Sequence, residues 1–202
     1  MIRILLVEPM NLLRGALAAT LSLEEDLDVV ADLSRLDQVL GMARAISPDV
    51  AIINIGLLAD DGLRTVARLN VEFPGCATLA LAGVDAPGRL GRALNGYVRG
   101  VVDTQAAPSE LVQSIRQLAR GERAIDARLA VAVLAAPRNP LSPRELDVLS
   151  VAASGVPSHE VAAKLHLSAG TVRNYISAIL RKTGARNRLE AVRLAEGAGW
   201  LR

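Results

Sequence analysis

Residues 142–184 have the sequence SPRELDVLSVAASGVPSHEVAAKLHLSAGTVRNYISAILRKTG, and this stretch decides the fold of the C-terminal part of the chain. Ser142, the proline after it and Glu145 form the pattern of a capping box with proline at the first helical position. Ser158 and Ser168 are residues of the N-capping type, and each precedes a further segment with apolar residues at helical spacing. The sequence therefore predicts three helices in close succession.

A fourth helix is expected after them, because Asn187 and Glu190 provide another helix start. The second and third predicted helices are joined by a short turn, and the small residue Ala162 stands where they would cross. Two helices joined in this way are typical of the helix-turn-helix arrangement. An all-α four-helix domain with a helix-turn-helix is therefore expected over residues 141–202.

The helix predicted over residues 169–182 has two different faces. Its apolar stripe consists of Val172, Ile176, Ile179 and Leu180. The opposite row consists of Gly170, Arg173, Asn174, Ser177 and Arg181. This row contains no acid, whereas the solvated face of a helix that binds other proteins usually mixes charges of both signs.

Arginine and asparagine match guanine and adenine edges in the major groove, and hydroxyls and lysine suit phosphate oxygens. DNA binding by the predicted third helix is therefore favoured over a merely solvated face. The residues expected to contact DNA are Ser168, Thr171, Arg173, Asn174, Ser177, Arg181 and Lys182.

The first part of the chain alternates two kinds of segment. Aliphatic runs of strand length lie at residues 2–7, 27–31, 50–55, 78–82 and 100–102. Segments with helical periodicity lie between and after them, at residues 12–23, 36–45, 62–73, 88–94 and 109–120. Strands that are apolar on both faces indicate a parallel sheet covered by helices. The order predicts an α/β fold, a (βα)5 flavodoxin-like domain with its crevice at the carboxyl ends of the strands.

Composition limits the class of protein. The chain is 51% apolar with a mean hydropathy of +0.31, which excludes intrinsic disorder. Its longest apolar run, residues 50–59, is about half of the roughly 20 residues that a bilayer requires. The first residues lack the pattern of a signal peptide, so a cytoplasmic protein without a membrane partner is expected.

Few residues are available for metal or covalent chemistry. The single cysteine, Cys76, cannot form a disulfide within the chain, and His159 and His166 are too isolated to ligate a metal. No pair of nucleophile and base is apparent. An enzyme is therefore disfavoured, and no cofactor and no metal are expected.

The charge is unevenly divided along the chain. Residues 1–137 carry 13 arginines and 16 acids, a net charge of −3, whereas residues 138–202 carry 10 cations and 5 acids, a net charge of +5. Both lysines fall in the second part. A basic tail on an acidic body suggests binding of nucleic acid, although a scatter of surface charge explains the division equally well.

The C-terminal motifs resemble the four-helix LuxR/FixJ-type DNA-binding domain. They are LSPRE at 141–145, Gly155, EVA at 160–162, Leu165, SAGTVR at 168–173 and GARNR at 184–188. The front part, with residues 89–94 and GER at 121–123, is similar to the receiver of NarL/FixJ response regulators, and RLAEGAGW at 193–200 is similar to the DesR-like members. The resemblance implies a receiver-like domain over 1–122, a linker with a short helix over 123–140 and a LuxR-type helix-turn-helix domain over 141–202.

The resemblance also implies where a receiver carries its chemistry. A working receiver phosphorylates an aspartate after its third strand, with an acidic pair for Mg²⁺, a hydroxyl and a lysine after its first, fourth and fifth strands. This chain has Asn54 at the acceptor position, Glu8 and Pro9 at the acidic pair, Ala82 at the hydroxyl and Thr104 at the lysine. An amide cannot form an acyl phosphate. The resemblance thus implies a degenerate phosphorylation pocket and a regulator that acts independently of aspartyl phosphorylation.

Two other interpretations of the first domain stay open. In one, Asp60, Asp61 or Asp103 replaces the missing acceptor. In the other, the degenerate pocket senses a small molecule, and its less polar residues allow an apolar one.

A homodimer on double-stranded DNA with an inverted-repeat operator is expected, with its contact in the last helix at residues 189–195. Trp200 is expected in the core or in that dimer contact, and Cys76 is expected to be a buried small residue. A small-molecule or protein effector would adjust the activity of such a regulator.

Overall fold

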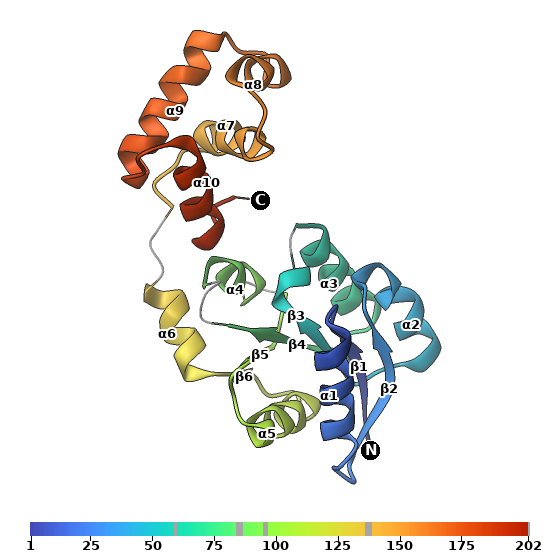
Figure 1. Cartoon of the computed structure of the whole chain (residues 1–202). Helices are drawn as coiled ribbons and strands as arrows, with labels where there is room; N and C mark the ends of the chain where they lie inside the picture. The colour runs from blue at the N-terminus through green and yellow to red at the C-terminus, as the bar shows by residue number, and fades with distance from the viewer. Residues whose placement is uncertain (59, 84–86, 95–96, 136–138, 202) are drawn as a thin grey trace. The chain divides into compact units, whose positions relative to one another are not determined.

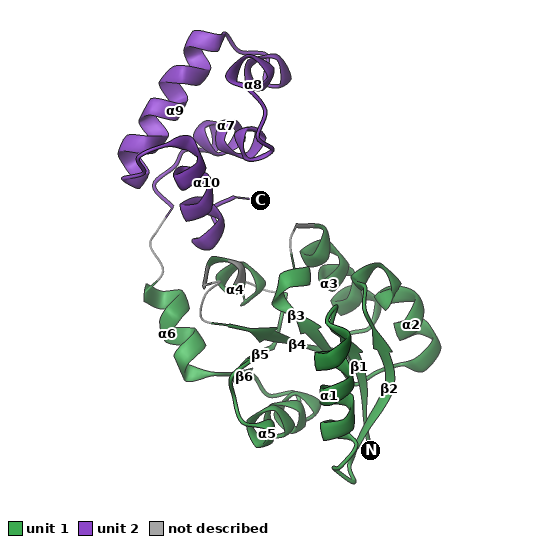
Figure 2. Cartoon of the chain, viewed as in Figure 1, with its two compact units in different colours: residues 1–135 green, residues 136–202 purple. Residues whose placement is uncertain are grey.

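The computed structural model describes residues 1–201 except 59, 84–86, 95–96 and 136–138. The chain divides into two compact units, Met1–Ala135 and Ala136–Arg202 (Figure 2). Each unit has its own apolar core. Within the described ranges, no helix combines the length and the apolar character needed to cross a membrane.

The first unit contains a parallel sheet of six strands in the order β2-β1-β3-β4-β5-β6 (Figure 1). The strands are β1 (Ile2–Val7), β2 (Leu27–Leu33), β3 (Val50–Asn54), β4 (Ala77–Ala82), β5 (Gly100–Asp103) and β6 (Ala124–Ile125). The first five have the flavodoxin-like order, which confirms the predicted fold. Their ends lie within two residues of the predicted ones.

Helices cover both faces of this sheet (Figure 1). They are α1 (Asn11–Leu21), α2 (Val39–Ile46), α3 (Asp60–Glu72), α4 (Pro87–Leu94), α5 (Pro108–Ala119) and α6 (Ala127–Ala135), with short 3-10 helices at Leu36–Gln38 and Ile55–Leu57. Alternate strand residues point to opposite faces. Ile4 and Leu6 therefore pack under α1 and α5, whereas Leu5 and Val7 pack under α2, α3 and α4.

The first unit extends beyond the predicted boundary at residue 122. Strand β6 pairs with β5 through Gly100 and Ala124, and α6 packs against α4 and β5. Leu129 on α6 is fully buried in the core that α2, α3 and α4 form with the sheet. Most of the segment expected as a linker over 123–140 is thus part of the first unit, because β6 and the buried side of α6 complete its sheet and core.

The second unit consists of four helices, as predicted (Figure 2). They are α7 (Pro143–Ala153), α8 (Ser158–Lys164), α9 (Ala169–Thr183) and α10 (Arg188–Gly197). The predicted capping box is present, since Ser142 and Glu145 exchange backbone hydrogen bonds through their side chains. The Asn187 side chain accepts a hydrogen bond from the Glu190 N–H at 2.9 Å. The apolar stripe of α9 enters the core, with Val172 1% and Ile179 0% exposed.

Leu129→Ala is expected to lower the free energy of unfolding of the first unit by about 2–5 kcal/mol, because the change leaves a cavity at a fully buried position. The matched control is Leu134→Ala on the same helix, where the side chain is 85% exposed. Urea unfolding followed by circular dichroism measures both units, and the fluorescence of Trp200, the sole tryptophan, follows the second unit. Identical unfolding curves for the Leu129 and Leu134 variants would contradict the assignment of α6 to this core.

Candidate functional site

The turn between α8 and α9 is held by local hydrogen bonds. The Leu167 N–H donates to the Ala162 carbonyl at 2.8 Å, and His166 takes a left-handed conformation with φ of 53° to make the turn. Ser168 Oγ accepts the Thr171 N–H at 3.0 Å and lies 2.8 Å from Thr171 Oγ1. Ser168, one of the residues expected at DNA, is thus the N-cap of α9, and Thr171, another of them, provides the N–H that Ser168 caps.

Helix α9 carries a row of exposed polar side chains. We call Arg173, Asn174, Ser177 and Arg181 the recognition row; all four are exposed. Within the part of the chain that the structure describes, none of their side chains makes a hydrogen bond or an ion pair. Their donors remain available to a ligand. The structure brings these four predicted residues together on one side of the helix, opposite the buried stripe.

Lys182 differs from the recognition row, because its ammonium has a partner inside the protein. Its Nζ lies 2.7 Å from Oε2 of Glu145, whose side chain is only 6% exposed. The Ser142 N–H donates to the same oxygen at 2.6 Å. Burial by itself would raise the pKa of Glu145, but the hydrogen bonds from Lys182 and Ser142 hold this pKa below its usual value. The carboxylate is therefore charged and paired.

Two arginines fix the turns around the helix pair, and sequence analysis did not identify them. Arg144 Nη2 donates to the Leu165 carbonyl at 2.9 Å, before the turn into α9. Arg188 Nη1 donates to the Val156 carbonyl at 2.8 Å, before α8. These bonds span 21 and 32 residues, so no local spacing in the sequence indicates them.

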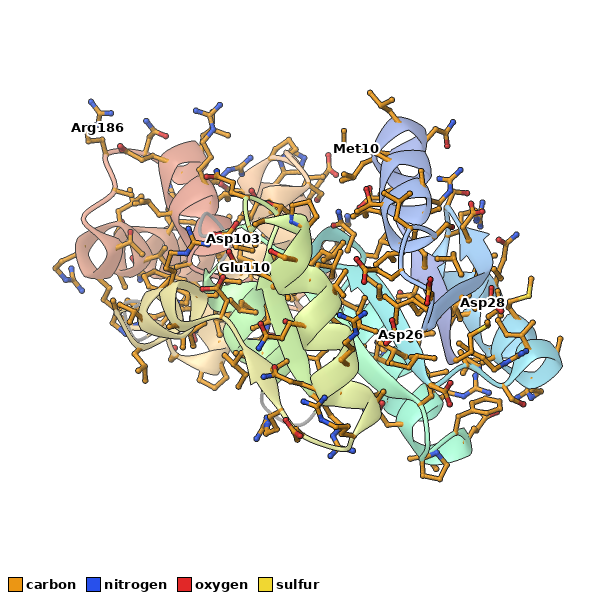
Figure 3. The ribbon with its side chains drawn as sticks, turned by 90° about the horizontal axis from the view of Figure 1, so that it is seen from below. Met10, Asp26, Asp28, Asp103, Glu110 and Arg186 are labelled. Atoms are coloured by element: carbon orange, nitrogen blue, oxygen red, sulfur yellow. The ribbon has the colours of Figure 1, made fainter. Side chains whose placement is uncertain are left out.

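In the first unit, Glu8 and Asn54 lie together at the carboxyl ends of β1 and β3. Glu8 is fully buried, and its Oε2 accepts a hydrogen bond from Asn54 Nδ2 at 2.7 Å. Its Oε1 accepts the N–H of Met10, which lies just before α1 (Figure 3), at 2.8 Å. Asn54 Oδ1 in turn accepts the Gly56 N–H at 2.7 Å. Both residues are thus satisfied by groups of the protein.

Arg14 places a cation at the same edge of the sheet. Its Nη1 donates to the Glu8 carbonyl at 2.8 Å, and its Nε donates to Asp32 Oδ1 at 2.7 Å. Its Nη2 donates to Asn11 Oδ1 at 2.9 Å. The Arg14 side chain is 17% exposed, so it ties the start of α1 to the ends of β1 and β2. Sequence analysis did not identify this residue either.

The other pocket positions add little chemistry. Ala82 is buried, Pro9 and Thr104 are exposed, and the Thr104 N–H donates to the Ala82 carbonyl at 2.9 Å. Asp103, at the end of β5 (Figure 3), is 6% exposed, and its Oδ1 accepts the Gln105 N–H at 2.9 Å.

The two other candidate acceptors lie in α3. The Asp61 side chain is 98% exposed and pairs with Arg64 at 3.2 Å, while the side chain of Asp60 lies outside the described residues. The structure therefore does not place Asp61 in a pocket.

The arrangement does not fit Mg²⁺, which requires several oxygen ligands. Both oxygens of Glu8 already accept hydrogen bonds, and Asn54 turns its NH₂ group toward Glu8. Among the described residues, no three His, Cys, Asp or Glu side chains are grouped closely enough to hold a metal ion. Cys76 is buried as predicted, and burial raises the pKa of its thiol to about 12.

A small cavity lies between α1 and α5, at the carboxyl ends of β4 and β5. Its volume is about 130 Å³, and its lining includes Leu13, Leu17, Leu111 and Thr104. Of the pocket positions discussed above, only Thr104 and the neighbouring Asp103 contribute to this lining. The space available to a small molecule is therefore displaced from Glu8 and Asn54.

Comparison with known proteins finds relatives of the helical unit and of the whole chain. Residues 139–195 match the model of "Bacterial regulatory proteins, luxR family". The chain is 40% identical over 200 residues to the response regulator RamR of Streptomyces coelicolor, covering 99% of this chain and 98% of RamR. It is 34% identical over 202 residues to the transcriptional regulatory protein DesR of Bacillus subtilis, covering both chains completely.

Solved structures share the fold. The response regulator ChrA of a heme-sensing two-component system is 27% identical with a TM-score of 0.60, covering 96% of each chain. RcsB, in a structure of two dimers bound to two parallel DNAs, is 20% identical with a TM-score of 0.68, covering 97% of this chain and 98% of that one. The relatives match along their whole length, through both the sheet-containing unit and the helical unit. The protein therefore belongs to the family of transcriptional response regulators with a luxR-type C-terminal domain.

Proposed function

We propose that this regulator binds DNA sequence-specifically by inserting α9 into the major groove, and that its first unit works without aspartyl phosphorylation. The recognition row carries the DNA-binding part of the proposal. Arg173 and Asn174 stand near the N-terminal end of α9, the end that contacts base edges in helix-turn-helix proteins. Both have forked donors, and neither side chain makes a hydrogen bond or an ion pair among the residues that the structure describes.

Arg173→Ala and Asn174→Ala are each expected to weaken specific binding by about 1–3 kcal/mol and to relax the base preference at one position, because each removes contacts to a base edge. The measurement is selection of binding sites from a random duplex library, followed by titration of the selected duplex. Ser150→Ala, at an exposed position of α7, is the control. Unchanged base preference in both α9 variants would rule out this placement of the helix.

The proposal includes a homodimer on an inverted-repeat operator. Two recognition helices reach successive major grooves on one side of DNA only when two copies are paired. Helix α10 exposes Leu189 and Leu194, which are 61% and 45% exposed, on either side of Arg193. Exposed leucines on the last helix support a dimer contact there.

A footprint of the wild-type chain is expected to show two half-sites about one helical turn apart in inverted orientation. Leu189→Glu is expected to shift sedimentation toward the monomer and to weaken binding to the two-site duplex at least tenfold, with about the same binding to a single half-site. Glu196→Gln, also exposed on α10, is the control. Full-affinity binding of a monomer to one half-site would contradict the dimer.

The phosphorylation-independent part of the proposal is supported by the hydrogen bond between Asn54 and Glu8. The amide has no carboxylate oxygen to attack a phosphoryl donor, and both oxygens of Glu8 already accept hydrogen bonds with which a metal would compete. Catalysis of phosphoryl transfer depends mainly on cations and donors placed around the transferring group. At the pocket Ala82 supplies no hydroxyl and Thr104 no cation.

The substitute acceptors are weaker candidates. Asp103 is buried with one oxygen held by a backbone N–H, and Asp61 stands on the open surface paired with Arg64. Sensing of a small molecule is the second candidate, favoured by the apolar cavity between α1 and α5. Its volume of about 130 Å³ is close to that of an engineered cavity of about 150 Å³ that binds benzene, so a small apolar molecule is the expected ligand.

Acetyl phosphate with Mg²⁺ is expected to give no phosphoprotein by intact mass and no change in DNA affinity. Asn54→Asp is expected to give none either, because Ala82 and Thr104 still withhold the hydroxyl and the cation. In that variant two carboxylates face each other where the amide now donates, so the folded state should bind a proton that the unfolded chain releases. Relative to wild type, the melting temperature of the variant should therefore be lowered most at neutral pH and above, and this difference should shrink as the pH falls.

Asn11→Asp, at the edge of the same crevice, is the control for the added charge. A stable adduct on the wild-type chain, mapped to Asp60, Asp61 or Asp103, would refute phosphorylation-independence and favour a substitute acceptor.

A further inference from the structure

Lys182 is the one predicted DNA-contacting residue whose charge is paired with a buried acid among the residues that the structure describes. We infer that Lys182 is a positioning residue, which fixes α9 against the start of α7 through Glu145, and that it does not neutralise a DNA phosphate. The inference rests on the proposed placement of α9 in the major groove. It assigns to Lys182 and Glu145 a role that the sequence did not indicate.

The contact joins two ends of the helical unit. Glu145 lies in the first turn of α7, and Lys182 lies in the last turn of α9, 37 residues further along the chain. One oxygen of Glu145 accepts both the Lys182 ammonium at 2.7 Å and the Ser142 N–H at 2.6 Å. The N-cap of α7 and the C-terminal end of α9 are therefore held by the same carboxylate.

This contact is important because Glu145 is buried. The Glu145 side chain is 6% exposed and that of Lys182 is 39% exposed. An acid at this depth needs its partner, because removal of one member of a buried pair leaves an uncompensated charge. The buried carboxylate of Glu145 therefore holds the Lys182 ammonium in place. A rotation of Lys182 toward a phosphate would leave Glu145 with only its neutral donors.

Pairing also changes what Lys182 contributes to DNA affinity. The salt dependence of binding follows the number of phosphates neutralised, at about 0.9 per phosphate in a plot of log K against log salt. A cation that already faces a carboxylate contributes little to this slope. Arg181, its neighbour in the sequence, is exposed and has no ion pair among the described contacts, so it is the matched candidate for a phosphate contact.

The helix transmits the position of its last turn to the recognition row. Arg173 and Lys182 are nine residues apart, about 14 Å along a rigid helix at about 1.5 Å per residue. Release of the C-terminal end allows α9 to tilt about its buried stripe, which moves the base-reading end out of register with the groove. Contacts to the phosphate backbone tolerate such a tilt better than bidentate contacts to base edges do.

The experiment compares Lys182→Met, Glu145→Gln, Lys182→Arg and Arg181→Gln in the full chain. The probes are a duplex selected from a random library by the wild-type protein and the same duplex with its sequence shuffled, each titrated at several salt concentrations. Lys182→Met is expected to lower the ratio of selected to shuffled affinity about tenfold and to keep the wild-type salt slope. Arg181→Gln is expected to weaken both duplexes alike and to reduce the slope by about one.

Glu145→Gln separates the two roles of Lys182 by sign. If Lys182 binds phosphate, removal of the competing acid frees the cation, and both duplexes bind more tightly. If Lys182 positions α9, the same change lowers the selectivity, and Lys182→Arg, which keeps the pairing, retains it. Should Lys182→Met not fold, the double variant with Glu145→Gln, which leaves no unpaired carboxylate, replaces it in the titrations.

A salt slope reduced by about one in Lys182→Met with unchanged selectivity, or tighter binding of both duplexes by Glu145→Gln, overturns the inference. Failure of the proposed function is recognised separately. In that case Arg173→Ala and Arg181→Gln leave DNA binding unchanged, whatever the Lys182 variants do.

Discussion

A carboxylate that is taken out of water needs hydrogen-bond donors, and in each unit of this protein one such group joins two elements that are distant in the sequence. In the first unit Glu8, with none of its surface exposed, accepts donors from Asn54 and Met10. In the second unit Glu145, 4% exposed, accepts donors from Lys182 and Ser142. Both acids take one donor from the adjoining chain and one from a distant element. Each pair therefore joins separate elements, β1 to β3 and α7 to α9.

The chemistry of the distant partner distinguishes the two sites. Asn54 is neutral, so it offers Glu8 a hydrogen bond but no counter-charge, and the Arg14 guanidinium stands at the Glu8 backbone as the nearby cation. Lys182 is charged, so it cancels the charge of Glu145 and holds the pKa of that acid low. At the first site both oxygens of Glu8 already accept hydrogen bonds, with which a metal would compete. At the second site Glu145 pairs with Lys182. Arg173 and Arg181 of the recognition row are then the cations of α9 that have no ion pair among the described contacts.

Local patterns made most of the fold predictable. Aliphatic runs predicted the first five strands, and the capping residues Ser142 and Asn187 predicted two helix starts, because these patterns depend on neighbours in the sequence. Strand β6 has only two residues, too few for a recognisable period, so the sequence pattern did not indicate a sixth strand. The resemblance to receivers indicated that Asn54 and Glu8 belong to one pocket. It could not indicate their mutual hydrogen bond, nor the contacts of Arg14 and Lys182, because distant partners are chosen by packing.

The satisfied state of Glu8 and Asn54 bears on how such a regulator is controlled. A ligand shifts an equilibrium only by its difference in affinity for two states, and a cation or phosphoryl group at this pocket would first have to break bonds that the protein already makes. A cation or phosphoryl group at Asn54 would therefore gain little binding free energy. Dimerisation on DNA offers an alternative, because occupancy of a two-site operator by a weakly associating monomer rises with the square of its concentration at low occupancy. Under the proposed control without aspartyl phosphorylation, the amount of the protein and whatever binds its exposed helices set the occupancy of the operator.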